Sequence, residues 1–416
     1  MRRSRRGLGA KRNDGIEHDQ GDESPFPASI SGLTPRRGAI LPPSGVTGNP
    51  WKLAREYLDH NLGTSPPGPL AAGPAEDAEY NIMTLELNRE YPELDDPEVF
   101  EQMVNLTVSQ MKPICGHLRR AQHAKATSCV TAEFRIADDV PTDLRHGIFR
   151  QPGYTFSAIV RLSNSQATFE RDGTGTARGF AIKLLDVVGT RVVTGGDSSQ
   201  DFLMIDHPVF PFPDPKAYVE TISRKDIPLV GDLVAAVHLA LLEPKELKIL
   251  NAIKGKHVAS PLEISYWSGT PSWLGPADGE GGHAVKYSAV SRQADRTAPP
   301  DHPEDLPDDY LTQALARYLE SQEAVFDFKV QLQTDPVAMP VEDVSVQWDE
   351  NDSKPITVAT LRIAPQSVDA SGELATKCES MSFNPWHALA EHRPMGGINR
   401  LRKVVYPAST TKRAGL

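Results

Sequence analysis

Two blocks of alternating apolar and polar residues constrain the fold of this 416-residue chain more than any other feature. In the first block, apolar residues occupy every second position of 130–136, and apolar runs rich in β-forming residues follow at 155–162 and 179–185. The second block consists of 326–332, which alternates in the same way, and 356–363. Alternation with a period of two is typical of strands that bury one face, so both blocks predict antiparallel sheet.

Helical patterns lie before, between and after these strand blocks. We expect helices at 86–111 and 231–253, and loops at the Gly- and Pro-rich stretches 275–282 and 299–307. Strands in two groups with helices inserted and appended predict an α+β protein whose antiparallel sheet closes into a β-barrel.

The first 75 residues are rich in Gly, Pro, Ser and charged residues, with a short helical patch near 51–58. We expect 1–75 to be a disordered or extended arm and 76–416 to be the folded domain. The basic start of the chain is followed by neither the apolar core of a signal peptide nor the acid-poor pattern of a transit peptide. No run of eighteen apolar residues occurs, so no transmembrane segment is expected.

Charge and cysteine content narrow the class further. The net charge of −11 argues against a general nucleic-acid binder. The chain has three cysteines and no CxxC pair, so we expect neither a disulfide framework nor a zinc site. We therefore expect a reducing compartment, the cytoplasm.

Near the C-terminus, Arg402 and Tyr406 lie four residues apart and share one helix face, and we expect Pro407 to end that helix. A guanidinium one turn from a phenol favours the phenolate, which is the form that ligates ferric iron. Taken alone, such a pair is usually a surface or packing pair.

Three other segments carry polar residues in unusual surroundings. His123 lies in a basic segment just before the first strand block, and could be structural. Arg161 and Arg178 are embedded in apolar strand residues, where an unpaired charge is very costly. A local carboxylate is the ordinary partner for such an arginine, and a haem propionate is the alternative.

These segments, in this order, resemble the catalases and the smaller catalase-related proteins. The resemblance spans roughly 110–416, although it is sparse between 230 and 320. The matching residues are Arg120, His123, Ala124 and Lys125 for Arg-x-x-His-Ala-Lys; Arg161-Leu162-Ser163 for Arg-Phe-Ser; Arg178 to Ala181 for Arg-Gly-Phe-Ala; Asp343 to Trp348 for Asp-x-x-x-x-Trp; Arg402, Tyr406 and Pro407 for Arg-x-x-x-Tyr-Pro; and Arg413 for the arginine that follows.

The resemblance implies haem b as cofactor, with Tyr406 as the iron ligand and His123 as the distal acid–base residue. It implies catalytic roles for His123, Ser163 and Asp206. It also implies that the haem is bound by Arg120, Arg161, Phe210, Tyr218, Arg402 and Arg413. We expect a homo-oligomer.

Three departures from the catalase pattern affect the expected activity. The catalase segment Asn-Asn-Thr-Pro-x-Phe-Phe is replaced by residues 205–211, which puts Ile205 where an amide helps hold peroxide and Asp206 beside it. Asp206 and His207 could form a metal pair, but adjacent residues seldom point at one ion, and we favour a turn. Thr410 and Lys412 replace histidines after the tyrosine. Since 416 residues leave little length for the long C-terminal domains of large catalases, we do not expect such a domain.

We therefore expect a haem-dependent enzyme that uses hydrogen peroxide or an organic hydroperoxide. A second reading within this class is an enzyme that rearranges fatty-acid hydroperoxides. A third is a haem-binding protein without turnover, and a fourth is a relative that has lost haem.

Overall fold

The computed structural model describes residues 85–415 except 115, 194–197, 226–234, 237, 241–242 and 294–296. The expected arm 1–75 and its helical patch therefore lie outside the described residues. The described residues fall within one unit, Gly68–Leu416. In the described part of the chain, no helix combines the length and the apolar character that crossing a membrane requires.

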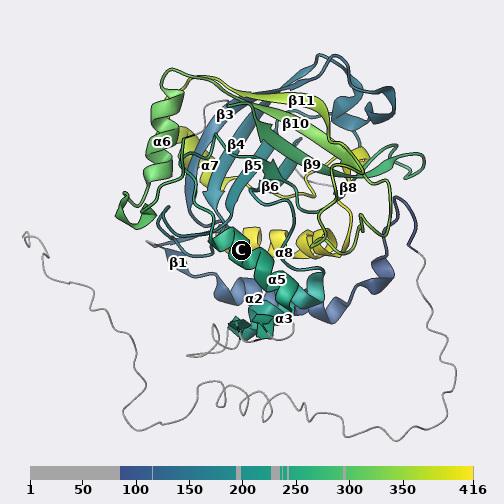
Figure 1. Cartoon of the computed structure of the whole chain (residues 1–416), viewed down its shortest axis with the longest axis horizontal. Coiled ribbons are helices and arrows are strands. Elements are labelled where there is room, and N and C mark those ends of the chain that lie inside the picture. The colour runs from purple at the N-terminus through teal and green to yellow at the C-terminus, as the bar shows by residue number, and fades with distance from the viewer. Residues whose placement is uncertain are drawn as a thin grey trace, which may run out of the picture. The chain divides into compact units, whose positions relative to one another are not determined.

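Antiparallel strands form a closed β-barrel, as the alternating blocks predict (Figure 1). Nine strands pair in the order β10-β11-β3-β4-β5-β6-β7-β9-β8, and pairing of β10 with β9 closes eight of them while β8 extends beside β9. The strands are β3 (Ala126–Ile136), β4 (Thr155–Asn164), β5 (Arg178–Leu184), β6 (Gln200–Ile205), β7 (Tyr266–Trp267), β8 (Ser272–Leu274), β9 (His283–Ser291), β10 (Ala324–Leu332) and β11 (Ile356–Ile363). A separate hairpin joins β1 (Pro113–Ile114) to β2 (His117–Leu118).

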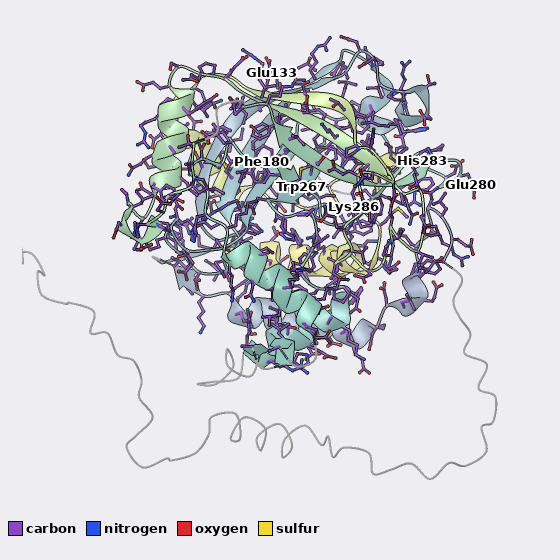
Figure 2. All side chains as sticks on the ribbon, viewed as in Figure 1. Glu133, Phe180, Trp267, Glu280, His283 and Lys286 are labelled. Atoms are coloured by element: carbon purple, nitrogen blue, oxygen red, sulfur yellow. A yellow bond between two sulfur atoms is a disulfide. The ribbon has the colours of Figure 1, made fainter. Side chains whose placement is uncertain are left out.

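The barrel interior is filled by aromatic side chains from neighbouring strands. Phe180, which is fully buried, lies 4.5 Å from Tyr266 and 5.0 Å from Phe326 between ring centroids. In Figure 2, Phe180 lies within the barrel, whereas the exposed Glu133 lies at its edge. The alternation in 130–136 is thus an alternation between this core and the outside.

Helices and short turns pack around the barrel. The helices are α2 (Pro97–Gln110), α3 (Pro215–Lys225), α5 (Pro244–Lys254), α6 (Tyr310–Leu319), α7 (Glu373–Ser380) and α8 (Gly397–Ala414). Turns of 3-10 helix are η1 (Pro92–Leu94), η2 (Thr142–Leu144), η3 (Gly147–Arg150), η4 (Pro303–Asp305) and η5 (Ala390–His392). The helix expected at 86–111 begins later, at Pro97, where the Asp96 side chain accepts a hydrogen bond from Glu98 N.

Pro407 does not end the C-terminal helix, contrary to the sequence-based expectation. Helix α8 runs through Pro407 and ends at Ala414, where Gly415 caps it in the left-handed conformation. The exposed proline forfeits one backbone hydrogen bond. Packing of Leu401 and Val405 in an apolar cluster with α2 and α3 offsets that loss. As a result, Tyr406 and Arg413 are two turns apart on the same helix face.

A disulfide joins Cys129 on β3 to Cys378 on α7, across 249 residues of sequence. The cysteine content of the sequence argues against a disulfide framework and does not predict this single bond. Spacing along the chain gave no sign of this bond, because the two cysteines meet only when α7 packs on the outer face of β3. Cys115 lies outside the described residues.

Candidate functional site

His123 lies in the turn that precedes β3. A side chain of the barrel strand β4 holds its ring in place. Its backbone has a positive φ of 56°, which few non-glycine residues adopt. The backbone N–H donates to Ser165 O at 3.1 Å, and the ring Nδ1 lies 3.0 Å from Ser163 Oγ on β4. The structure therefore brings together two of the three residues expected to be catalytic.

Gly179, in the Arg-Gly-Phe-Ala segment, makes room for this histidine. A Cβ atom at position 179 would lie 2.5 Å from His123 Nδ1 and 2.6 Å from Ser163 Oγ. Such distances are far inside van der Waals contact, so only glycine leaves space for the ring. The glycine of that segment is thus explained by the site rather than by a turn.

Ile205 belongs to the same row of the sheet as Ser163. Ser163 pairs with Gly179, and Gly179 pairs with Ile205. Directly paired residues of neighbouring strands point to the same face of a sheet, so Ser163 and Ile205 face the side on which His123 lies. Between them, Gly179 contributes no side chain.

His123 is held neutral by its surroundings. Although part of the residue is exposed, burial of the ring and then the positive charges of Arg161, Arg402 and Arg120 lower the pKa of His123 to about 3. Desolvation and nearby cations both disfavour the imidazolium. A neutral imidazole fixed through Nδ1 has its other nitrogen, Nε2, available to accept a proton.

Arginines from distant segments meet beside His123 and form what we call the arginine cluster, namely Arg119, Arg120, Arg161 and Arg413. The first three form ion pairs with Glu379 of α7 at 3.3, 3.0 and 3.2 Å. Arg161 also donates to the carbonyl of His123 at 2.9 Å. The expected haem-binding arginines 120, 161 and 413 are thus brought together.

Backbone carbonyls at the end of α7 complete the contacts of the cluster. Arg120 donates to Cys378 O at 2.9 Å and to Met381 O at 2.8 Å. Arg413 donates to Glu379 O at 2.8 Å and to Met381 O at 3.0 Å. The sequence predicted that Arg161 needs an anion. It did not identify Glu379 as that anion, because 218 residues separate the two.

The cluster carries more positive than negative charge. In the described part of the chain, one carboxylate, Glu379, is ion-paired with it. Burial and the neighbouring Arg161 lower the pKa of Arg120 to about 8, which Glu379 partly offsets. Arg119 Nε is buried without a hydrogen-bond partner. An excess of cations that are buried or partly buried suits a ligand that brings carboxylates.

Helix α8 carries Arg402 and Tyr406. Arg402 donates to Thr270 Oγ1 at 3.2 Å and to Asn399 Oδ1 at 3.3 Å, and its guanidinium lies 5.6 Å from the ring centroid of Phe210. Burial, and after it the nearby Tyr406, raises the pKa of Tyr218 to about 12. The positive charge of Arg402 acts in the opposite direction and lowers this pKa. Arg402 and Tyr218 both pack against Phe210, and Tyr406 is close enough to Tyr218 to affect its pKa.

Aromatic and apolar side chains line the same region. Phe210 and Tyr218 pack edge to face with centroids 5.3 Å apart. Phe210, Tyr218, Ile205 and Tyr406 are each half-buried. Together with the cluster, these surfaces fit a flat, largely apolar cofactor with carboxylates, which is the chemistry of haem.

Asp206 points away from this group of residues. Its Oδ1 accepts a hydrogen bond from Arg178 N at 2.7 Å, and its Oδ2 lies 3.1 Å from Lys256 Nζ. The residue is buried and braces the end of β6. These contacts give Asp206 a structural role, and its catalytic role stays a prediction. His207 Nδ1 lies 3.2 Å from Val209 O, within a bend of the chain.

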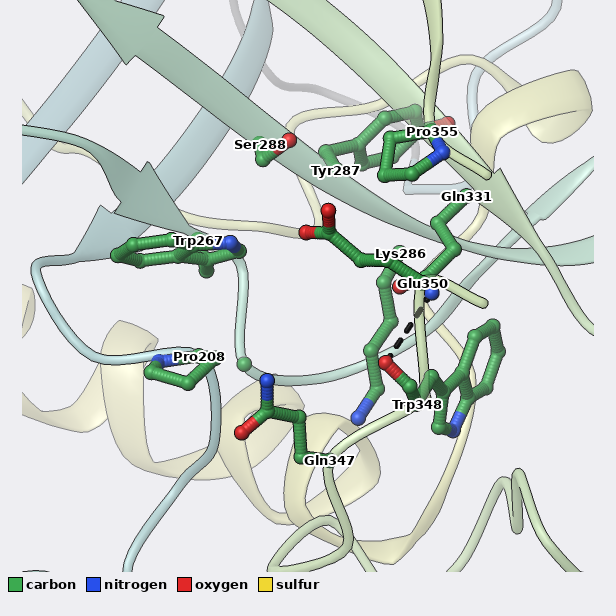
Figure 3. A pocket seen from close by; sticks show the side chains of 11 residues that line it. Pro208, Trp267, Lys286, Tyr287, Ser288, Gln331, Gln347, Trp348, Glu350 and Pro355 are labelled. Carbon is green, nitrogen blue, oxygen red and sulfur yellow. Dashed lines mark hydrogen bonds between the residues drawn. The ribbon is translucent and has the colours of Figure 1, made fainter. Parts of the chain in front are cut away.

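A separate pocket lies between β7, β9 and the segment after β10 (Figure 3). Trp267, Lys286 and Trp348 line it, and Gln331 donates to Trp348 O at 3.1 Å. Burial lowers the pKa of Lys286 to about 7. None of the residues expected at the haem site lines this pocket. A second pocket does reach that site, through Arg402, Thr270 and Asn399.

No family model matches the chain. A catalase-related peroxidase of Mycolicibacterium paratuberculosis (strain ATCC BAA-968 / K-10) is 24% identical over 271 residues, which cover 64% of this chain and 80% of the relative. A fungal catalase has a TM-score of 0.59 at 20% identity, over 71% of this chain and 59% of its own. The chain thus spans well under two thirds of that catalase.

Catalase A from Saccharomyces cerevisiae has a TM-score of 0.59 at 17% identity, over 79% of this chain and 67% of its own. A bacterial catalase has a TM-score of 0.56 at 17% identity, over 86% of this chain and 69% of its own. The protein has a catalase-like fold. The expected α+β class and the resemblance to the catalase superfamily are thereby confirmed.

The space that Gly179 leaves in this catalase-like barrel gives a first prediction. Gly179→Ala should displace the His123 ring and lower the free energy of unfolding by about 1–3 kcal/mol, the usual cost of overpacking. Chemical denaturation measures this loss. Adding Ser163→Ala to the variant removes one of the two clashes and should recover part of the loss. Equal stability of Gly179→Ala and wild type would contradict the geometry.

The neutral state of His123 gives a second prediction. Since its folded pKa of about 3 lies below the ordinary value of 6.5, its contribution to stability is full above pH 6.5 and is lost as pH falls toward 3. Between pH 7.5 and 5, wild type should lose about 2 kcal/mol more than His123→Leu. Denaturation at both pH values tests this, and equal pH slopes would refute a buried neutral histidine.

Proposed function

We propose that this protein is a haem-dependent oxidoreductase that uses hydrogen peroxide or an organic hydroperoxide as its substrate. The carrying observation is a neutral His123, held by Ser163 and lying within the electrostatic reach of Arg402 on α8. The catalase-like fold and the name of the curated relative, a catalase-related peroxidase, support peroxide as the substrate class.

The haem, of type b in our proposal, would be held by residues from both sides of the site. The arginine cluster would bind its carboxylates, Phe210 and Tyr218 would pack on its apolar body, and Tyr406 would ligate the iron. Arg402 lies one helical turn before Tyr406 on α8. The bound haem supplies the iron chemistry by which the peroxide O–O bond is cleaved.

His123 moves the proton in this scheme. Its Nε2 accepts the proton of the bound peroxide oxygen and returns it to the departing oxygen, which leaves as water or an alcohol. Ser163 keeps the ring oriented through Nδ1, and burial together with the surrounding arginines keeps the ring neutral between turnovers. Acid–base assistance of this kind is typically worth about 10²–10⁴-fold in rate.

Ile205 favours a second candidate, the conversion of a larger, apolar hydroperoxide such as that of a fatty acid. It lies on the His123 side of the sheet, where a polar amide would offer peroxide a hydrogen bond. An apolar side chain at that point suits a carbon chain better than a second molecule of hydrogen peroxide. Binding of haem without turnover is the outcome if neither substrate reacts.

Other expectations stay predictions. The homo-oligomer and the lack of nucleic-acid binding are untested. The disulfide between Cys129 and Cys378 weighs against the cytoplasm, because reducing compartments rarely retain such bonds.

Replacing Tyr406 tests the iron ligand. Tyr406→Phe removes the phenolate oxygen, so haem affinity should fall at least about tenfold. Even the loss of a residue that only hydrogen-bonds to a metal ligand lowers metal affinity by about 10–100-fold. Spectral titration with haem measures this, and wild type should show a high-spin ferric spectrum of the tyrosinate type. Tyr218→Phe is the matched control and should keep that spectrum. An unchanged spectrum in Tyr406→Phe would refute the ligand assignment.

Replacing Ile205 tests the substrate. Wild type should release oxygen from hydrogen peroxide well below the rate of a typical catalase while it consumes an organic hydroperoxide. Ile205→Asn restores one hydrogen bond, worth about 0.5–1.5 kcal/mol, and should raise oxygen release about two- to tenfold. Ile205→Leu keeps the apolar surface and should leave it unchanged. Full catalase turnover by wild type would contradict this account.

A further inference from the structure

Glu379 lies at the centre of the arginine cluster, where the proposed function would bring the carboxylates of haem. Its Oε2 pairs with Arg119 and Arg120, and its Oε1 lies 3.2 Å from Arg161 Nη2. Although burial alone would raise it, the pKa of Glu379 is lowered by Arg161 and Arg120. The carboxylate is therefore ionised and shared among three guanidinium groups.

A disulfide and four hydrogen bonds hold Glu379 in this place. The preceding residue, Cys378, is disulfide-bonded to Cys129, which pairs directly with Arg161 across β3 and β4. Arg120 and Arg413 donate hydrogen bonds to backbone carbonyls of this segment, namely those of Cys378, Glu379 and Met381. Since the covalent bond and these hydrogen bonds fix the end of α7, Glu379 is part of the cluster's architecture.

Charge balance shows what this carboxylate does. Four arginines face one ion-paired carboxylate in the described residues, so the cluster is strongly positive before any ligand binds. Guanidinium groups this close repel each other, and removing the one anion would leave that repulsion uncompensated. A ligand with two carboxylates would relieve most of it.

We propose that Glu379 is a positioning residue that stands in for the ligand's carboxylates, keeps the arginine cluster assembled before the cofactor arrives, and weakens the cofactor's binding in return. The inference rests on the proposed haem binding. Its consequence follows from linkage: loss of Glu379 destabilises the cofactor-free protein more than the loaded one, so binding becomes tighter.

The test uses metal-free protoporphyrin IX, which carries two carboxylates but no iron for Tyr406. Fluorescence titration should give Glu379→Gln a dissociation constant about tenfold below that of wild type, which equals about 1.4 kcal/mol. Chemical denaturation without porphyrin should show the variant to be less stable, and rising salt should lessen that loss. Protoporphyrin IX dimethyl ester lacks the charges and should bind both proteins equally.

Glu373→Gln is the matched control, since it makes the same change at an exposed position in the first turn of α7. It should alter neither stability nor porphyrin affinity. If Glu379→Gln does not fold, Glu379→Asp serves instead: it keeps the charge but shortens its reach, and should change both readouts in the same directions by less.

The two proposals fail in different ways. Wild type that binds neither haem nor porphyrin overturns the proposed function. Wild type that binds them, with a Glu379 variant of equal or weaker porphyrin affinity, overturns the inference. Equal gains for porphyrin and for its dimethyl ester would also overturn it, because the gain would then not depend on carboxylates.

Discussion

The ion pair between Arg161 and Glu379 is the contact on which the rest of the site depends. Arg161 stands on the outer face of the barrel wall, almost fully buried, so it must have an anion. Glu379 supplies it from α7, and the same guanidinium donates to the carbonyl of His123. This one buried charge thus connects the barrel wall, α7 and His123.

The same excess of positive charge serves two ends. It provides the surroundings that a dicarboxylate ligand needs, and it contributes to the depressed pKa of His123 through Arg161, Arg402 and Arg120. A histidine that stayed cationic there would be a poor base and would add to the repulsion. The arginines therefore serve the recognition of an anion, and they add to burial, the larger cause, in keeping His123 neutral.

The parts of the fold that the sequence predicted are those governed by local pattern. The strands at 130–136 and 356–363 alternate because one face is buried, whereas β9 was missed because Ala284 to Ala289 are buried on both faces and do not alternate. Glu379 and the Cys129–Cys378 bond could not be predicted, since both depend on α7 docking on β3. The helical continuation past Pro407 likewise depends on tertiary packing.

The row from Ser163 through Gly179 to Ile205 separates two tasks along one face of the sheet. The hydroxyl of Ser163 orients the imidazole of His123, and Gly179 leaves the space for that ring. Ile205, at the other end of the row, presents an apolar side chain on the same face. Neighbouring strands are about 4.8 Å apart, so Ile205 and Ser163 are about 10 Å apart. Because Gly179 separates them without a side chain of its own, the surface offered to a substrate can change at Ile205 while the contacts that hold His123 stay the same.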